Sequence, residues 1–270
     1  MLNGVMPLRH VMAATDESDA GRQAVHAALR IASLAGARAS ILRVLPFDGA
    51  TTQGAVEQLR RWVESDLPAL HPAPPIEYAV ANGVPGVEIA RIGEWMRADL
   101  LVLGRKHRSQ AMRLLLGDTA DAVARRSHVP CLFVPAACTR ARRVLVALDG
   151  SGRGAAVLWV ANDFARQIGA ELRVMTVERV YAGEPAELAV GTPAARTTRI
   201  RAEVDRTLAL ELEVRRGEIP EQILAAVEEG ACDVLVIGCH RGGPAGVIEA
   251  GSTGRRVIHE APCAVLTVPL

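Results

Sequence analysis

The sequence is poor in aromatic residues and in excess charge. Phenylalanine, tryptophan and tyrosine make up 3% of the 270 residues, and the formal net charge at pH 7 is +1. Nucleic-acid-binding proteins commonly use stacking aromatic side chains and a positive field, so these values argue against a nucleic-acid partner. No apolar run is long enough to span a membrane, and residues 1–9 contain no signal-peptide pattern. We therefore expect a cytoplasmic protein with no membrane partner.

The five cysteines are not arranged as a metal or redox motif. None forms a Cys-x-x-Cys pair, so neither a structural zinc site nor a disulfide framework is indicated. Cys239 and His240 are adjacent, but no second pair stands at ligand spacing, so we expect free thiols and no protein metal site. The Walker phosphate loop, the dinucleotide-binding glycine fingerprint and the Gly-x-Ser-x-Gly nucleophile elbow are also missing.

The chain does contain an internal repeat. Half of the residues are hydrophobic, as in globular proteins, and four segments recur in the same order at an offset of 132 to 134 residues. The matched segments are 10–18 with 144–151, 98–104 with 232–238, 116–119 with 250–253, and 129–135 with 261–269. We predict two domains, 1–138 and 139–270, joined at the short polar segment 136–143.

Each half alternates apolar runs with helical patterns. In the first half we expect strands at 11–14, 39–45, 76–81, 100–103 and 131–134, and helices at 18–35, 56–67, 85–96 and 119–126. The second half repeats this order, with a longer connection over 180–197 before a helix at 198–210. Alternation of this kind predicts α/β domains in which helices cover both faces of a parallel sheet.

An acidic residue and a glycine stand at the carboxyl ends of two predicted strands in the second half. Asp149 follows the first strand and Gly238 ends the fourth. Ligands of such sheets bind beyond the carboxyl ends of the strands, where the strand order reverses, so we predict a site between these two strands.

The residues of this predicted site suit a phosphate. Gly238 has no side chain and permits a close backbone approach. Gly251, Ser252 and Thr253 open a predicted helix, where backbone N–H groups and the helix dipole favour anions. Asp149 can accept hydrogen bonds from a ribose or a base.

Structural explanations compete at each of these positions. Ser252 or Thr253 can serve only as a helix cap, and Gly251 only as a turn residue. The segment Asp149-Gly150-Ser151 can equally be a turn that caps a helix. The residues alone leave these alternatives open.

Both halves resemble the universal stress protein family. The matching residues are 144–151, the segment Gly238-x2-Arg241-x9-Gly251-Ser252, and the closing 262–266. The resemblance implies two tandem, doubly wound, five-stranded parallel sheets of strand order 3-2-1-4-5, as in the adenine nucleotide alpha hydrolase-like fold. It also implies ATP, AMP or ADP as ligand, with or without Mg²⁺. At the adenine it places the backbone near Val177, together with Ile237 and either Ala147 or Leu148. It places Asp149 at the ribose, and Gly238, Gly251, Ser252 and Thr253 at the phosphates.

The sequence departs from the family motif in both halves. Arg241 replaces the middle glycine in the second half, where its guanidinium can either obstruct the phosphates or bind them. In the first half His107 replaces that glycine and Asp118 replaces the serine, so that a carboxylate would stand near the phosphates. Arg105, Lys106 and Arg108 could offset this repulsion, but such a charge run is usually a solvated loop. We predict that the first half binds ATP weakly or not at all.

These observations favour an ATP-binding regulatory module of the stress response over an enzyme. Any ATP hydrolysis is expected to be slow, because no general base and no Walker-type lysine is evident. The alternative is a nucleotide-free scaffold with vestigial pockets, and a third is an adenylating or phosphate-transferring enzyme. The apolar last strands, 132–135 and 265–269, are candidate exposed edges, which invite pairing. Because universal stress domains commonly dimerise at this strand, the resemblance implies that the two halves form an internal pseudo-dimer. Whether two chains associate further as a homodimer is left open.

Overall fold

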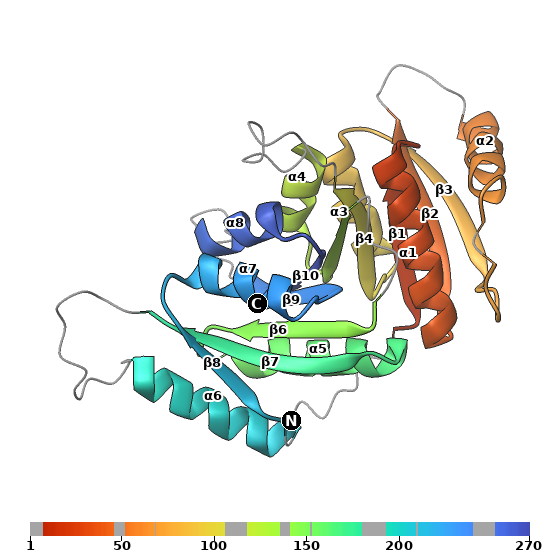
Figure 1. Ribbon diagram of the computed structural model, residues 1–270. Coiled ribbons are helices and arrows are strands. Elements are labelled where there is room, and N and C mark those ends of the chain that lie inside the picture. Colours follow the sequence, from red (N-terminus) through yellow and green to blue (C-terminus); the bar gives the residue numbers. More distant parts are fainter. Residues whose placement is uncertain are drawn as a thin grey trace.

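The strands and helices follow the predicted order in both halves. Figure 1 shows the computed structural model, which describes residues 8–45, 52–67, 69–105, 118–135, 141–151, 153–179, 193–208, 210–239 and 252–270. The first half consists of β1 (His10–Thr15), α1 (Asp19–Ala35), β2 (Arg38–Leu45), α2 (Thr52–Glu64), β3 (Ile76–Asn82), α3 (Pro85–Trp95), β4 (Leu100–Arg105), α4 (Asp118–Arg126) and β5 (Cys131–Pro135). The second half consists of β6 (Arg143–Leu148), α5 (Gly154–Ile168), β7 (Glu171–Glu178), α6 (Pro193–Thr207), β8 (Leu212–Arg216), α7 (Ile219–Glu229), β9 (Val234–Cys239), α8 (Ser252–Glu260) and β10 (Ala264–Pro269).

The ten strands form one sheet rather than two separate ones. Their order is β3-β2-β1-β4-β5-β10-β9-β6-β7-β8, so each half has the expected order 3-2-1-4-5 and the second half runs in reverse. Neighbouring strands within each half are parallel. The last strands, β5 and β10, are antiparallel, with Leu132 opposite Leu266, and this pairing of the two halves was predicted. Because each last strand covers the other, neither is an exposed edge.

Helices cover both faces of the continuous sheet, as the alternation predicted (Figure 1). One buried apolar cluster contains residues of α1, α2, α5 and α6, and a second contains residues of α3, α4, α7 and α8. Both clusters extend through the two halves. The halves therefore share their hydrophobic core, and we expect them to stabilise one another.

The ends of the first helix in each half show how local sequence sets the boundaries. Ser18 caps α1 by accepting a hydrogen bond from the Gly21 N–H. Gly36 ends α1 and Gly169 ends α5, both in the left-handed conformation, with φ of 65° and 66°. Glycine adopts this conformation without steric cost, which explains its presence at both ends.

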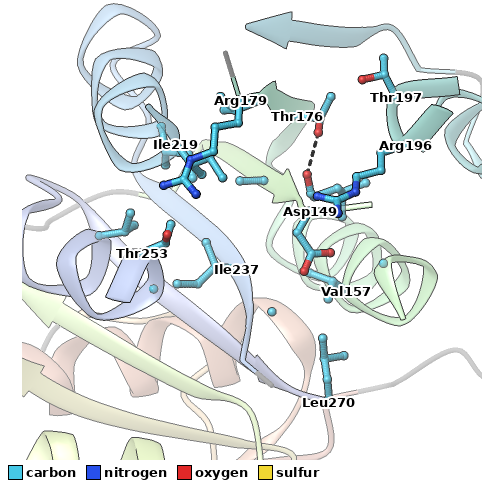
Figure 2. Close-up of a pocket in the computed structure, with 18 residues that line it drawn as sticks. Asp149, Val157, Thr176, Arg179, Arg196, Thr197, Ile219, Ile237, Thr253 and Leu270 are labelled. Carbon is cyan, nitrogen blue, oxygen red and sulfur yellow. Dashed lines mark hydrogen bonds between the residues drawn. The ribbon is translucent and has the colours of Figure 1, made fainter. Parts of the chain in front are cut away.

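The predicted connection over 180–197 is wrong in its second part. Helix α6 begins at Pro193, because proline fits the first turn of a helix, and it ends at Thr207. Residues 180–192 lie outside the described residues. The correction matters for function, since the early turns of α6 lie near the carboxyl end of β6 (Figure 2).

Candidate functional site

Each half contains a cavity at the carboxyl ends of its strands, where the strand order reverses. The second-half cavity has a volume of about 390 Å³ and opens between the neighbouring strands β6 and β9. Among its lining residues are Gly154, Val157, Thr176, Arg179, Arg196, Thr197, Ile219, Ile223, Gly254, Val257 and Leu270. The volume lies in the range of small-molecule and cofactor sites.

Most of the predicted site residues lie together in this cavity. The lining includes Ala147, Leu148, Asp149, Val177, Ile237, Gly238 and Thr253. Ser252 begins helix α8, and its side chain is not described. Arg241 and Gly251 lie outside the described residues, so both alternatives for Arg241 stay predictions.

The segment after β6 forms a turn, as one of the alternatives predicted. The Asp149 Oδ1 accepts a hydrogen bond of 2.8 Å from the Ser151 N–H, and Gly150 has a φ of +70°. The helix-cap part of that alternative is wrong, because α5 begins at Gly154 and Arg153 is its N-cap residue. Asp149 therefore shapes the turn and lines the cavity at the same time.

The neighbouring strand end is held by a side chain that sequence reasoning missed. The Thr176 hydroxyl on β7 donates a hydrogen bond of 2.8 Å to the Leu148 carbonyl, drawn as the dashed line in Figure 2. Both residues are buried and line the cavity. This bond fixes the ends of β6 and β7 beside Asp149.

Two arginines from separate elements also line the cavity and were not predicted. Arg179 directly follows β7, and its guanidinium lies 3.3 Å from the Glu218 carboxylate. Arg196 belongs to α6. In Figure 2 the Arg179 side chain enters from the side of Ile219 and Thr253, and Arg196 enters from the side of Asp149. The sequence could have indicated Arg179 as a lining residue, because it stands two residues after Val177. Arg196 could be placed near the cavity only once the start of α6 was known.

The first-half cavity occupies the matching position and has a volume of about 340 Å³. Its carboxylate is Asp16, whose Oδ1 accepts hydrogen bonds from the Ser18 hydroxyl and from the Ser18 N–H, the latter at 3.1 Å. Thr119 of α4 lines it as Thr253 lines the second cavity. Within the described residues, the first-half cavity is lined by no arginine, lysine or histidine.

The glycines at the ends of β4 and β9 have different neighbours. A Cβ on Gly104 would clash with the Ala20 carbonyl group and lie 2.9 Å from the Gly21 nitrogen, so the close approach of α1 requires glycine. A Cβ on Gly238 would instead meet the side chains of Leu270 at 2.8 Å and Val157 at 3.0 Å. The first glycine thus has a packing reason that is independent of any ligand.

The assignment of Arg105 to a solvated loop is wrong. Arg105 is the last residue of β4, is 7% exposed, and hydrogen-bonds carbonyl groups of the second half. Its side chain is therefore engaged away from the first-half cavity, whose lining does not include it. Lys106, His107 and Arg108 lie outside the described residues, as does the side chain of Asp118.

The described cysteines behave as structural residues. Cys131, Cys232, Cys239 and Cys263 are buried, and none of these four is in a disulfide. Burial raises the pKa of the Cys239 thiol to about 12, so it is protonated and a poor metal ligand at neutral pH. Among the described residues, no three His, Cys, Asp or Glu side chains are gathered so that they could hold a metal ion. No helix in the same residues is both long and apolar enough to cross a membrane.

Known proteins match both the fold and the two halves of the sequence. A universal stress protein of Methanocaldococcus jannaschii is 29% identical over 144 residues, which are 49% of this chain and 85% of that protein. A universal stress protein of Thermus aquaticus is 36% identical over 137 residues, which are 47% of this chain and 98% of that protein. The crystal structure of a universal stress protein from Archaeoglobus fulgidus shares the fold over 96% of this chain and 98% of that one, with a TM-score of 0.72 and 22% identity.

The family assignment covers nearly the whole chain. The model of the universal stress protein family matches residues 7–135 and again residues 140–269. The two matched regions correspond to the two halves of the ten-stranded sheet. The chain therefore belongs to the universal stress protein family and carries two of its domains in tandem.

Proposed function

We propose that this protein is an ATP-binding regulatory module of the stress response, with the nucleotide in the second-half cavity. The observation that carries the proposal is the combination of Asp149, Thr253 and two arginines around one cavity of about 390 Å³. The matching first-half cavity has the carboxylate and the threonine but no cationic side chain among its described lining residues. A polyanionic ligand therefore favours the second half.

The adenosine part of the ligand would lie over the ends of β6 and β7. Ala147 and Ile237 supply apolar surface, and the Val177 backbone supplies hydrogen-bonding groups at the carboxyl end of its strand. Asp149 would accept hydrogen bonds from the ribose hydroxyls. Family membership supports this placement, since the family model covers residues 140–269 and the resemblance implies adenine and ribose contacts at these positions.

The phosphates would lie at the N-terminus of α8. Ser252 and Thr253 begin this helix, whose unpaired N–H groups and dipole favour an anion. Arg179 would add a guanidinium on the same side of the cavity (Figure 2). Its ion pair with Glu218 is about half exposed on both sides, so exchanging Glu218 for a phosphate costs little. Mg²⁺ would be held mainly by the phosphates themselves.

We propose binding rather than turnover as the activity. Asp149 is the only carboxylate among the described lining residues, and its Oδ1 is engaged by the Ser151 N–H. No lysine is among these residues either. Phosphoryl transfer depends on positioned groups around the γ-phosphate, so hydrolysis would be slow.

The test is equilibrium titration of the purified full chain with ATP, AMP and adenosine. Asp149→Ala and Ser252→Ala should each weaken ATP binding by about tenfold or more, as expected for loss of a charge-assisted hydrogen bond or of a helix-terminal hydroxyl contact. The matched control is Asp16→Ala, which removes the carboxylate from the first-half cavity and should leave ATP affinity unchanged. An equal loss from Asp16→Ala would overturn the assignment of the nucleotide to the second half.

A nucleotide-free scaffold is the second candidate, and one surface favours it. Trp95 is 77% exposed on α3, together with Val87 and the neighbouring Val84. Contiguous exposed apolar patches mark interaction sites, and an exposed tryptophan is a residue that such a patch would contain. No detectable affinity at millimolar ATP in the titration above would favour this candidate over the ATP-binding module.

A further inference from the structure

Arg105 connects the first half of the chain to the helix that borders the second-half cavity. It ends β4, and its guanidinium donates hydrogen bonds to four carbonyl groups around the end of α8. The His259 and Cys263 carbonyl oxygens each accept at 3.1 Å, and the Ile258 and Ala261 carbonyls also accept. The side chain is buried, so these bonds are shielded from water.

Two of these bonds, to Ile258 and His259, satisfy carbonyl groups in the last turn of α8, and the other two bind the segment that follows it. The last carbonyl groups of a helix have no partner inside the helix, and the helix dipole places partial negative charge there. A guanidinium offers several N–H donors in a fixed planar arrangement and carries a full positive charge. His259 cannot replace it near neutral pH, because burial and the nearby Arg255 lower the pKa of this histidine. Arg105 therefore supplies the cation at this end of α8.

The opposite end of the same helix lines the second-half cavity. Thr253, Gly254 and Val257 of α8 are lining residues, and α8 contains nine residues. A helix of this length is a rigid rod of about 13 Å. A group that holds one end in place therefore also sets the position of the N–H groups at the other end.

The second half has no equivalent of Arg105 at the matching position of β9. Arg105 pairs with Pro135 in the sheet, and Cys239 pairs with Pro269 at the matching position. Cys239 is buried, and its short thiol carries no positive charge. Within the described residues, α4 thus receives no guanidinium from β9, and the contact runs from the first half to the second.

We infer that Arg105 is a positioning residue for the second-half site: it holds α8 so that the helix N-terminus meets the phosphates of the bound nucleotide. This inference rests on the proposed function. The first half then supports the phosphate side of a site whose described lining residues all belong to the second half. The adenine and ribose side, built on β6 and β7, does not depend on Arg105.

The test compares ATP with adenosine in the full chain. Arg105→Gln removes the charge and most donors, and it should weaken ATP binding about tenfold while adenosine affinity changes less than about twofold. Arg105→Lys keeps a charge without the planar group, so ATP affinity should be intermediate. Arg43→Gln is the matched control, because it breaks a partly buried ion pair of 2.6 Å with Glu17 in the first half without touching α8.

A second measurement tests whether Arg105 holds the end of α8 without any ligand. Amide hydrogen exchange at residues 258–261 and at Cys263 should be faster in Arg105→Gln than in the unchanged chain, and unchanged in Arg43→Gln. If Arg105→Gln does not fold, Arg105→Lys decides, since a loss confined to ATP supports the inference.

Three outcomes separate the two proposals. Equal losses for ATP and adenosine, or no loss for either, overturn the role of Arg105 and leave the proposed function standing. Unchanged exchange in α8 also overturns the role of Arg105. If the unchanged chain binds neither ligand, the proposed function fails and the role of Arg105 in binding fails with it.

Discussion

The two halves of the chain place a cavity at the same point of the same fold but line it with different charges. Asp16 and Asp149 each follow the first strand of their half, and each carboxylate accepts a hydrogen bond from the N–H of the serine two residues later. Arg179 and Arg196 then add positive charge to the second-half cavity alone, as far as the described lining residues show. A shared fold thus preserves the shape of a site, while a few side chains decide which ligand charge it favours.

The largest expected difference between the halves concerns Gly104 and Gly238, which stand one residue before the ends of β4 and β9. Gly104→Ala would force the Ala20 carbonyl and the Gly21 nitrogen of α1 away, and backbone cannot move cheaply. We expect a loss of about 3 kcal/mol in the free energy of unfolding, measured by urea denaturation. Gly238→Ala meets side chains rather than backbone: the flexible end of Leu270 at 2.8 Å and Val157 at 3.0 Å. It should therefore cost less than about 1.5 kcal/mol.

One result would contradict the packing explanation for Gly104. Equal losses from the two alanine variants would mean that α1 does not pack more tightly on β4 than α5 packs on β9. The packing explanation for Gly104 would then be wrong, and the glycine would need another reason.

An intermediate effect is expected from the two arginines of the second-half cavity. The double variant Arg179→Gln with Arg196→Gln should weaken ATP binding about tenfold in calorimetric titration and adenosine binding much less. Its ATP affinity should also depend less on salt concentration, since fewer charges meet the phosphates. The control is Arg60→Gln with Arg61→Gln, which removes the same charge from exposed positions on α2.

If the control pair weakens ATP binding as much as the cavity pair, net charge rather than local contact explains the effect. The charge difference between the two cavities would then not decide where the nucleotide binds.

The smallest expected difference is a pH dependence that belongs to the first half. His10 on β1 is buried, with its Nε2 2.7 Å from the Ser40 hydroxyl. Burial, and then the nearby Arg38, lower the pKa of His10 below its usual 6.5, while Glu77 and Asp99 oppose this. As pH falls through about 6.5, the unfolded chain therefore takes up a proton before the folded one, and stability decreases.

His10→Gln should flatten this acid-side decrease in the free energy of unfolding, measured by urea denaturation between about pH 7.5 and pH 5.5. One proton limits the effect to about 1.4 kcal/mol per pH unit. Arg143→Gln alters the matching position of β6, where no histidine stands, and should leave the slope unchanged. An unchanged slope in His10→Gln would show that His10 titrates alike in both states.

Much of this protein could be predicted from repetition and periodicity. The matched segments located both domains, and the alternating apolar runs located the strands, because buried parallel strands leave a short continuous apolar signal. The sequence also predicted that Asp149 and Gly238 line one site, because the carboxyl ends of neighbouring parallel strands lie at one edge of the sheet.

The sequence did not predict the joining of the two sheets, the start of α6 or the contacts of Arg105. The pairing of the last strands was expected, but not that it would join all strands into one sheet with shared core clusters. Arg196 was assigned to a connection, because the long segment before α6 hid the start of the helix at Pro193. Arg105 was assigned to a charged loop, because its neighbours in the sequence are Lys106, His107 and Arg108.

The sequence by itself determined the duplicated α/β domains, the order of their elements and the polar residues at the ends of the central strands. These features depend on local periodicity, turn chemistry and repetition, all of which are present in the order of the residues. Only the tertiary structure decided that Arg105 holds α8, since Arg105 and Ile258 are 153 residues apart in the chain. Such a contact follows from how two finished halves pack, because packing brings together side chains whose spacing in the sequence has no regular period.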